Sequence, residues 1–212
     1  ETGVLGIKEN AITSSVDKFK MTVTGVGAHG AKPENSVDPI LAASHFVSGL
    51  QSIISRNVSP LSSAVVSVTH FESGHTWNII PEKAFLEGTI RTSDNETRKL
   101  IEERFKAFVQ GNDVSFGTKT ELDFIKSNPA TNNDSILCEK ARQVAERVNL
   151  KSEVTPLSMV GEDFAYFQEV TKGIIIWVGS GIGPNLHNPK FKADYSVLNY
   201  IPEYFVELLI SL

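Results

Sequence analysis

The stretch DKFKMTVTGVGAHGAKPENSVDPI, residues 17–40, decides how the fold begins. In residues 17–24 apolar and polar side chains alternate, which is typical of a half-buried strand. A loop rich in glycine follows and carries a single histidine, His29. The loop ends at Asp38 and Pro39, a capping residue and a favoured first helical residue, so we expect a helix to begin there.

The same reasoning extends to residue 126. Runs rich in β-branched or alternating apolar residues predict further strands over residues 63–71, 79–91 and 118–125. An S-x-x-E start at Ser93 predicts a second helix, which Gly111 is expected to stop. The order strand, helix, strand, strand, helix, strand is that of the ferredoxin-like (split βαβ) arrangement, one sheet backed by two helices. The expected fold class is α/β, with this domain at residues 16–126.

The remaining residues, 1–15 and 127–212, predict only a piece of a second domain. The run GIIIWVG, residues 173–179, is continuously apolar, as in strands buried on both faces of a parallel α/β sheet. A helical pattern precedes it at 135–148. One strand with helices around it does not close an α/β domain. We therefore expect residues 127–212 to be part of a larger domain, with residues 1–15 as a linker or edge.

Composition excludes several classes of protein. The chain has 212 residues, of which 41% are hydrophobic and 21% charged, as in ordinary globular proteins. Its net charge of −5 and the lack of Lys/Arg clusters argue against binding to nucleic acid or an anionic membrane. The apolar runs are far too short to span a bilayer, and no signal peptide is recognisable. Cys138 is the sole cysteine, so a reducing cytoplasm is the expected location.

Three polar residues of the first domain are candidates for a site, and each has a simpler alternative. His29 is either an exposed turn residue or faces a ligand, which neighbouring glycines allow to approach closely. Asn78, in the segment WNIIP, is a turn residue with local hydrogen bonds or a polar group entering a strand. Arg91 is a solvated strand end or a bidentate partner of a carboxylate. We expect Asn78 and Arg91 to lie on one strand, and therefore in one sheet.

Three further candidate residues lie in the C-terminal region. Glu162 and Asp163 are metal ligands, a general acid or base, or a helix cap, and a cap is favoured for Asp163 because an apolar helical stretch follows. His187 comes just after the apolar run, where α/β folds place their sites, and is a candidate zinc ligand. The residues alone reveal no second ligand nearby, so they give no closed site.

Several segments occur in an order that resembles a known family: GVGAHGAKPENSVDPI, WNIIPEKAFLEGTIRT, MVGEDFAYF and LHNPKF. They are similar to the C-terminal portion of the dinuclear-metal amidohydrolases of the aminoacylase/carboxypeptidase superfamily, peptidase family M20. The resemblance points to the hippurate, N-acyl-amino-acid and indole-acetyl-amino-acid hydrolase branch. It implies a ferredoxin-like lid and dimerisation domain, inserted into a zinc-peptidase α/β domain to which the flanks belong.

The resemblance also implies roles for residues. His29 would reach into the active site of a dimer partner and stabilise the developing oxyanion. Asn78 and Arg91 would bind the substrate's carboxylate or the tetrahedral intermediate. The segment from Gly161 through Glu162 to Asp163 would line the pocket.

The resemblance further implies two divalent metals per full-length subunit. They would be zinc, with manganese or cobalt as alternatives for a mixed nitrogen and oxygen site. His187 would be the last ligand in chain order. The family's other ligands, a Cys-x-His element, a paired glutamate element and a further histidine, are not found in these residues. One position departs from the family: Glu34 stands where relatives often carry a second histidine.

The expected function is therefore that of the C-terminal portion of a metal-dependent amidohydrolase. The full-length enzyme would cleave the amide bond of N-acyl or N-aroyl amino acids or of small peptides, as a homodimer joined through the lid. This chain alone is expected to be inactive. The alternative is a non-catalytic dimerisation or ligand-binding module built on the ferredoxin-like domain.

Overall fold

The computed structural model describes residues 1–184 and 186–212. Within them the chain forms two compact units. The sheet unit consists of Ser14–Ala130 and Met159–Gly161, and the flanking unit of Glu1–Thr13, Thr131–Ser158 and Glu162–Leu212. Each unit has its own hydrophobic core.

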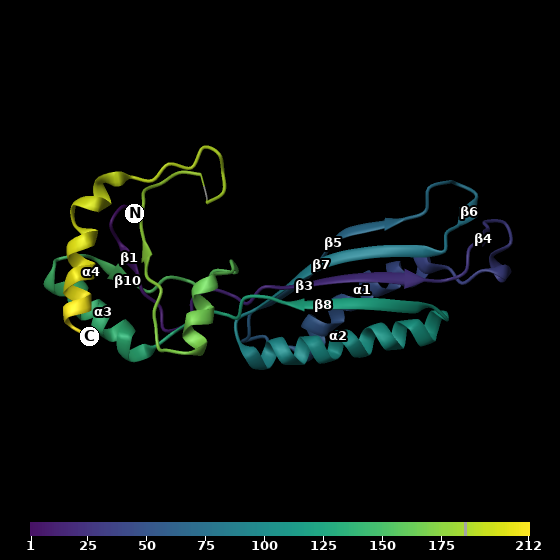
Figure 1. The fold of residues 1–212 in the computed structure, drawn as a ribbon, viewed down its shortest axis with the longest axis horizontal. Helices are drawn as coiled ribbons and strands as arrows, with labels where there is room; N and C mark the ends of the chain where they lie inside the picture. Colours follow the sequence, from purple (N-terminus) through teal and green to yellow (C-terminus); the bar gives the residue numbers. More distant parts are fainter. Residues whose placement is uncertain (185) are drawn as a thin grey trace. The chain divides into compact units, whose positions relative to one another are not determined.

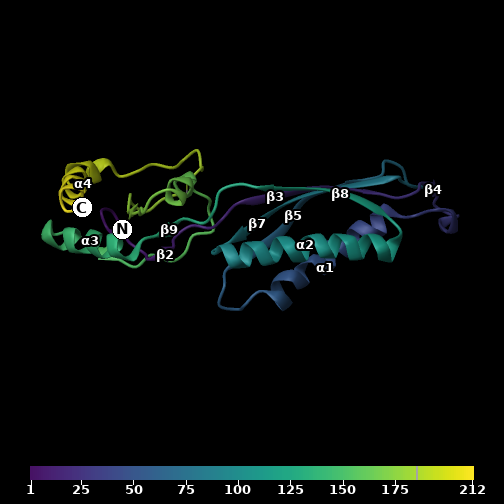
Figure 2. The same ribbon diagram turned by 60° about the horizontal axis from the view of Figure 1, so that its bottom comes forward.

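The sheet unit is built on a four-stranded antiparallel sheet in the order β5-β7-β3-β8. Its strands are β3 (Asp17–Thr24), β5 (Ala64–Ser73), β7 (Lys83–Thr92) and β8 (Lys119–Lys126). Two helices, α1 (Pro39–Asn57) and α2 (Asn95–Phe116), cover one face of this sheet (Figures 1 and 2). The order along the chain and across the sheet confirms the expected ferredoxin-like arrangement within an α/β fold.

The two α-helices of the sheet unit, α1 and α2, begin at aspartates. Asp38 caps α1, where its Oδ1 accepts hydrogen bonds from the N–H groups of Ile40 (2.8 Å) and Leu41 (3.2 Å). This confirms the start read from the sequence. The start read for α2 was one residue early, because Asp94 rather than Ser93 accepts the hydrogen bond of the Thr97 N–H, at 2.7 Å.

The end predicted for α2 was wrong. Gly111 does not stop the helix, which continues to Phe116. The residue that ends it is Gly117, whose φ of 72° lies in the left-handed region and whose N–H donates to the carbonyl of Asp113 at 2.8 Å. Glycine is favoured at such a terminus because it has no Cβ to oppose a positive φ.

The chain enters and leaves the sheet at one place. The N–H of Val16 donates to the carbonyl of Asn128 at 2.8 Å, and the N–H of Ser127 donates to the carbonyl of Val16 at 3.1 Å. Next to this crossing the side chain of Asp17 is fully buried and bound by the guanidinium of Arg98. The carboxylate also accepts the Ser127 N–H at 3.2 Å. The buried charge is thus paired and hydrogen-bonded, as buried charges must be.

The flanking unit contains short strands around two helices. The helices α3 (Ser135–Arg147) and α4 (Ile201–Ile210) share its core with Leu5 and Ile7 near the N-terminus. Two small sheets pair β10 (Ser152–Glu153) and β11 (Trp177–Val178) with β1 (Leu5–Gly6), and β2 (Asn10–Ala11) with β9 (Asn132–Asn133). Among the described residues, no helix is long and apolar enough to cross a membrane.

The prediction of a long parallel strand at residues 173–179 was wrong. Only Trp177–Val178 form a strand, and they pair antiparallel to β1. The side chain of Asn133 explains part of this difference. It accepts the N–H of Ile175 and donates to its carbonyl, both at 2.8 Å, so these backbone groups bind a side chain where a neighbouring strand would bind them.

Candidate functional site

A two-stranded ribbon joins His29 and Asn78 at one end of the sheet unit. Strand β4 (Ala28–His29) pairs antiparallel with β6 (Ile79–Ile80), so that His29 lies opposite Ile79. The N–H of the next residue, Gly30, donates to the carbonyl of Asn78 at 2.8 Å. The Asn78 side chain accepts a hydrogen bond from the hydroxyl of Thr76 at 3.2 Å. The structure therefore brings these two predicted site residues together.

The glycine loop that presents His29 begins with a close backbone contact. A Cβ on Gly25 would lie 2.0 Å from the carbonyl oxygen of Val37, so no larger residue fits at this position. The N–H of Val26 donates to that same carbonyl at 2.9 Å. The loop is thus tied to the residues just before α1, and it projects the histidine beyond the end of β3.

The ring of His29 is exposed and held from one side. Its Nδ1 accepts a hydrogen bond from the backbone N–H of Ala31 at 3.0 Å. The carbonyl of His29 accepts the N–H of Lys32 at 2.8 Å, which closes a turn behind the ring. Glu34 lies in a short 3₁₀ helix of this loop, Pro33–Asn35, and nothing in its surroundings explains the glutamate at a position where the resemblance leads us to expect histidine.

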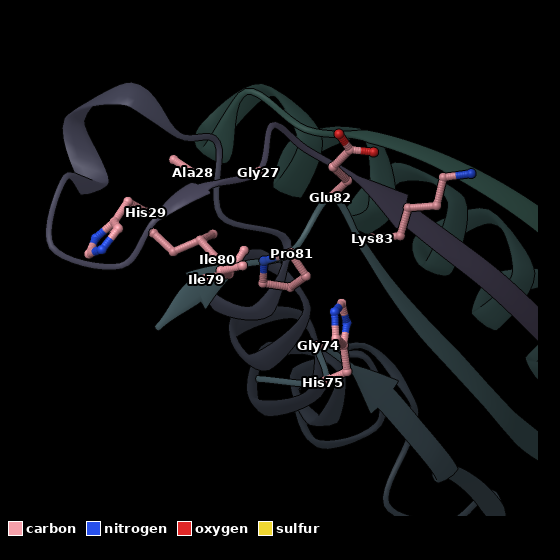
Figure 3. A pocket seen from close by; sticks show the side chains of 10 residues that line it. All are labelled: Gly27, Ala28, His29, Gly74, His75, Ile79, Ile80, Pro81, Glu82 and Lys83. Carbon is pink, nitrogen blue, oxygen red and sulfur yellow. The ribbon is translucent and has the colours of Figure 1, made fainter. Parts of the chain in front are cut away.

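A cavity of about 710 Å³ opens beside this ribbon (Figure 3). Its wall is largely apolar, from Ile79, Ile80 and Pro81, and two histidines lie on it, His29 and His75. The sequence reasoning overlooked His75, although it lies in the turn ESGHTWN directly before Asn78. The arrangement resembles a ligand site in that a few polar groups border an apolar hollow.

Arg91 lies near the far end of β7. Its Nη1 donates to the carbonyl of Ile90 at 3.1 Å and to the hydroxyl of Thr89. Burial lowers the pKa of the Arg91 guanidinium below its ordinary value, and the charge of Asp17 opposes that shift. The group borders a smaller cavity of about 300 Å³ on the sheet, together with Val16 and Lys18.

The expectation that Asn78 and Arg91 share one sheet was wrong. Asn78 adjoins β6, which pairs with β4, whereas Arg91 belongs to β7 of the four-stranded sheet. Lys83, at the start of β7, lines the cavity of His29. From there to Arg91 the strand covers about 26 Å at the ordinary rise of 3.3 Å per residue. Arg91 therefore does not share a small substrate with His29 of the same chain.

Gly161 lies at the Arg91 end of the sheet unit. The preceding carbonyl, of Val160, accepts the N–H of Ser14 at 3.1 Å, and a Cβ on Gly161 would lie 2.1 Å from the Cγ2 of Val16. The same Val16 lines the cavity beside Arg91. Gly161 and Arg91 thus belong to one end, and His29 and Asn78 to the other.

The capping role expected of Asp163 belongs to its neighbour. Glu162 is the N-cap of the 3₁₀ helix Asp163–Glu169, and its carboxylate accepts the N–H of Phe164 at 3.4 Å. The prediction was one residue late. A carboxylate that caps a helix through one oxygen keeps its other oxygen available for a second partner.

His187 is exposed, in a loop of the flanking unit, and its φ of 66° is unusual for a residue other than glycine. Such a backbone is often found where a side chain is held for a function. Among the described residues, no three His, Cys, Asp or Glu side chains gather closely enough to hold a metal ion. His187 would supply one donor to a metal, and the described residues do not complete the set.

Comparison with known proteins begins with the sheet unit. Residues 13–115 match the peptidase dimerisation domain of the M20 family. Most of that match falls on the ferredoxin-like sheet and on the loop that carries His29.

Relatives of known function extend the similarity over nearly the whole chain. An N-acetylcysteine deacetylase of Bacillus subtilis is 37% identical over 98% of this chain and 55% of its own length. A second N-acetyl-L-cysteine deacetylase of the same organism is 36% identical, over 92% of this chain and 47% of its own length. The chain thus spans about half the length of these relatives.

A solved structure adds the fold. A dinuclear metal-binding peptidase of the M20 family from Bacillus subtilis superposes with a TM-score of 0.83 at 32% identity, over 98% of this chain and 52% of its own. Both units of the chain are therefore found in a metal-binding relative.

Proposed function

Because the chain belongs to the M20 peptidase family, with its dimerisation domain at residues 13–115, we propose that it serves a metal-dependent amidohydrolase. The reaction is the hydrolysis of the amide bond of N-acyl or N-aroyl amino acids or small peptides. The observation that carries the proposal is the pair His29 and Asn78, held together by the β4–β6 ribbon with the imidazole exposed.

Amide hydrolysis requires an activated water, a base, and hydrogen-bond donors for the oxygen that becomes negative. A bound divalent metal would supply the activated water by lowering the pKa of that water to about 7. Zinc is favoured, and manganese or cobalt are the alternatives. His29 acts as the donor. The Asn78 amide, next to it, offers a further donor to the intermediate or to the substrate's carboxylate.

Arg91 and Gly161 serve the other end of the substrate. The guanidinium presents a planar fork that matches a carboxylate, the group that every N-acyl amino acid carries. Gly161 and Glu162 line the pocket, and His187 supplies one metal ligand. Within one subunit, the His29 end and the Arg91 end of the sheet unit belong to different sites, because about 26 Å of strand separates them.

A homodimer resolves this separation. Strand β5 is one edge of the sheet, and its sequence AVVSVTHFES contains neither lysine nor proline. The other edge, β8, carries Lys119 and Lys126, charges of the kind that discourage strand pairing. Antiparallel pairing of two β5 edges about a two-fold axis lays the His29 end of one subunit beside the Arg91 end of the other. Each active site then takes residues from both subunits.

The flanking unit is proposed to pack against further metal-binding protein structure. Apolar side chains of α4 face outward, among them Leu209 (69% exposed) and Ile210 (75% exposed). Contiguous exposed apolar residues of this kind mark surfaces that another structure covers. Because the described residues hold no cluster of metal ligands, the 212 residues by themselves are proposed to be inactive. A reducing cytoplasm is the proposed location.

The test compares this chain with the full-length protein. Both are assayed for zinc content and for hydrolysis of N-acetylcysteine, other N-acetyl amino acids and benzoyl-amino acids. The proposal expects two metals and turnover for the full-length protein alone. Stoichiometric zinc and turnover in the 212-residue chain would contradict the proposed inactivity, and no amide hydrolysis in the full-length protein would contradict the enzyme.

One observation favours the alternative of a non-catalytic binding module. The cavity of about 710 Å³ lies wholly within the sheet unit, so a ligand there needs nothing from the flanks. Calorimetric titration of the 212-residue chain with N-acyl amino acids distinguishes the two. Tight binding by this chain, together with no turnover in the full-length protein, supports the module.

A further inference from the structure

We propose that the backbone N–H of Ala31 fixes the neutral imidazole of His29 in the tautomer with its proton on Nε2. Ala31 is then a positioning residue, and it acts through its backbone. The tautomer itself does not depend on the proposed function. Its use in stabilising an oxyanion rests on that function.

The direction of one hydrogen bond carries the inference. The backbone N–H of Ala31 can only donate, and its acceptor is Nδ1 of His29 at 3.0 Å. An acceptor nitrogen needs a free lone pair, and a neutral imidazole has one acceptor and one N–H. The proton must therefore be on Nε2. His45 offers a contrast, because its Nδ1 lies 3.0 Å from the side-chain oxygen of Asn112, a contact that by itself points to the opposite tautomer.

The backbone around His29 keeps this donor in place. The N–H of Gly30 is bound to the carbonyl of Asn78, and the N–H of Lys32 to the carbonyl of His29, both at 2.8 Å. The N–H of Ala31, between these two, points back at the ring. All three donors are backbone groups. Exchanging the side chain of Ala31 therefore leaves its hydrogen bond to His29 intact, and only proline removes the N–H donor.

The tautomer determines what the ring offers to a ligand. Nε2 carries a hydrogen and faces away from the turn, so the ring is a hydrogen-bond donor before any substrate arrives. In this form Nε2 has no lone pair with which to take a proton or bind a metal. A donor that is oriented in advance needs no reorganisation when negative charge develops on a carbonyl oxygen.

Nitrogen NMR of the ¹⁵N-labelled 212-residue chain tests the tautomer without any catalysis. The spectra are recorded at about pH 8.5, where a histidine is ordinarily neutral. We expect a protonated Nε2 and an unprotonated Nδ1 for His29, with a scalar coupling through the hydrogen bond between that Nδ1 and the Ala31 nitrogen. A protonated Nδ1, or the absence of this coupling, overturns the proposal. His75, on the same cavity and with no ring hydrogen bond among the described residues, is the internal reference.

Two variants separate the donor from the side chain. Ala31→Gly keeps the N–H and should leave the spectrum of His29 unchanged. Ala31→Pro removes the N–H, and the ratio of the Nε2–H to the Nδ1–H form should fall about two- to tenfold, the usual net effect of one hydrogen bond. An unchanged ratio in the proline variant, with the other histidine signals in place, counts against Ala31.

The catalytic use is tested separately in the full-length protein. The amide nitrogen of glutamine lies close to the position of Nε2, and that of asparagine close to Nδ1. His29→Asn should lose about 10²–10³ in kcat, as when an oxyanion donor is removed, and His29→Gln should lose clearly less. If both variants lose activity equally while the NMR result stands, the oxyanion role fails and the tautomer remains.

Discussion

His29 and Arg91 lie at opposite ends of the sheet unit. His29 borders a cavity together with Lys83, the first residue of β7, whereas Arg91 is next to the last residue of the same strand. Two residues so placed serve one substrate only if they come from different subunits.

Mixed dimers test this directly. In the full-length protein, His29→Ala and Arg91→Ala should each abolish most turnover while metal content stays intact. Unfolding the two variants together and refolding them produces hybrid dimers, in which one site of two has both residues. Because half of the dimers are hybrids, about a quarter of wild-type activity should return. No recovery in the mixture would mean that both residues act within one subunit.

A substitution that introduces one charge can identify which edge strand, β5 or β8, forms the proposed dimer interface. Thr69 is exposed near the middle of β5, so it would lie close to its own counterpart across a two-fold axis. Thr69→Lys places like charges there and should convert the proposed dimer to a monomer in sedimentation experiments. Glu121→Lys, on the exposed edge of β8, is the matched control and should leave the dimer intact. The opposite pattern would assign the interface to β8.

His187 is predicted to bind metal. His187→Ala in the full-length protein should weaken zinc binding by at least about tenfold. Loss of a residue that hydrogen-bonds to a metal ligand already costs that much, and loss of the ligand itself should cost no less. Metal content after dialysis against a buffered chelator is the measurement. His75→Ala removes another exposed histidine and should leave the metal in place. Equal zinc retention in both variants contradicts the assignment.

Two glycines of the sheet unit should respond to alanine in opposite ways. A Cβ on Gly88 would lie 2.2 Å from both Phe19 and the carbonyl of Ser67, so Gly88→Ala should destabilise the unit by about 1–3 kcal/mol or more. Gly111 has nothing within 4 Å of its virtual Cβ and lies inside α2, so Gly111→Ala should stabilise it by about 0.5–1 kcal/mol. Urea unfolding measures both. A loss of stability in Gly111→Ala would contradict the continuous helix.

Because of Tyr204, we expect the flanking unit to lose folding stability at alkaline pH. Its ring is fully buried, its hydroxyl donates to the carbonyl of Ala141 at 3.1 Å, and burial raises its pKa to about 12. The folded state thus holds this proton more tightly than the unfolded chain, whose tyrosine pKa is about 10. The resulting stability is complete below pH 10 and is lost as the pH rises towards 12.

Tyr204→Phe checks the sign of this effect. At neutral pH the variant loses one hydrogen bond, about 0.5–1.5 kcal/mol. Between pH 10 and pH 12 its free energy of unfolding should decline less steeply than that of the parent. A parallel decline in both proteins would show that another group causes the alkaline loss.

The elements that could be predicted from the sequence are those with a periodic pattern of apolar residues or a helix-capping residue. Alternation along residues 17–24 and the aspartate at position 38 mark β3 and the start of α1, and both are found in place. The β4–β6 ribbon has no such signal. Its two strands have only two residues each, and they are about fifty residues apart in the sequence. A segment this short shows no periodicity.

The site residues illustrate the same limit. Asn78 and Arg91 read as one strand because apolar residues alternate with charged or polar ones along most of the intervening run. Pro81 lies between β6 and β7, and the two strands join different sheets. Likewise the apolar run at residues 173–179 predicts one long strand, but the side chain of Asn133 binds the backbone N–H and carbonyl of Ile175. Contacts made by a side chain distant in sequence leave no trace in local pattern.

The crossing at Val16, Ser127 and Asn128 has an evolutionary consequence. Since the chain that enters the sheet unit lies hydrogen-bonded to the chain that leaves it, a host protein can gain, lose or exchange the whole domain without rerouting its own backbone. An inserted domain and its host can then change in sequence independently of each other.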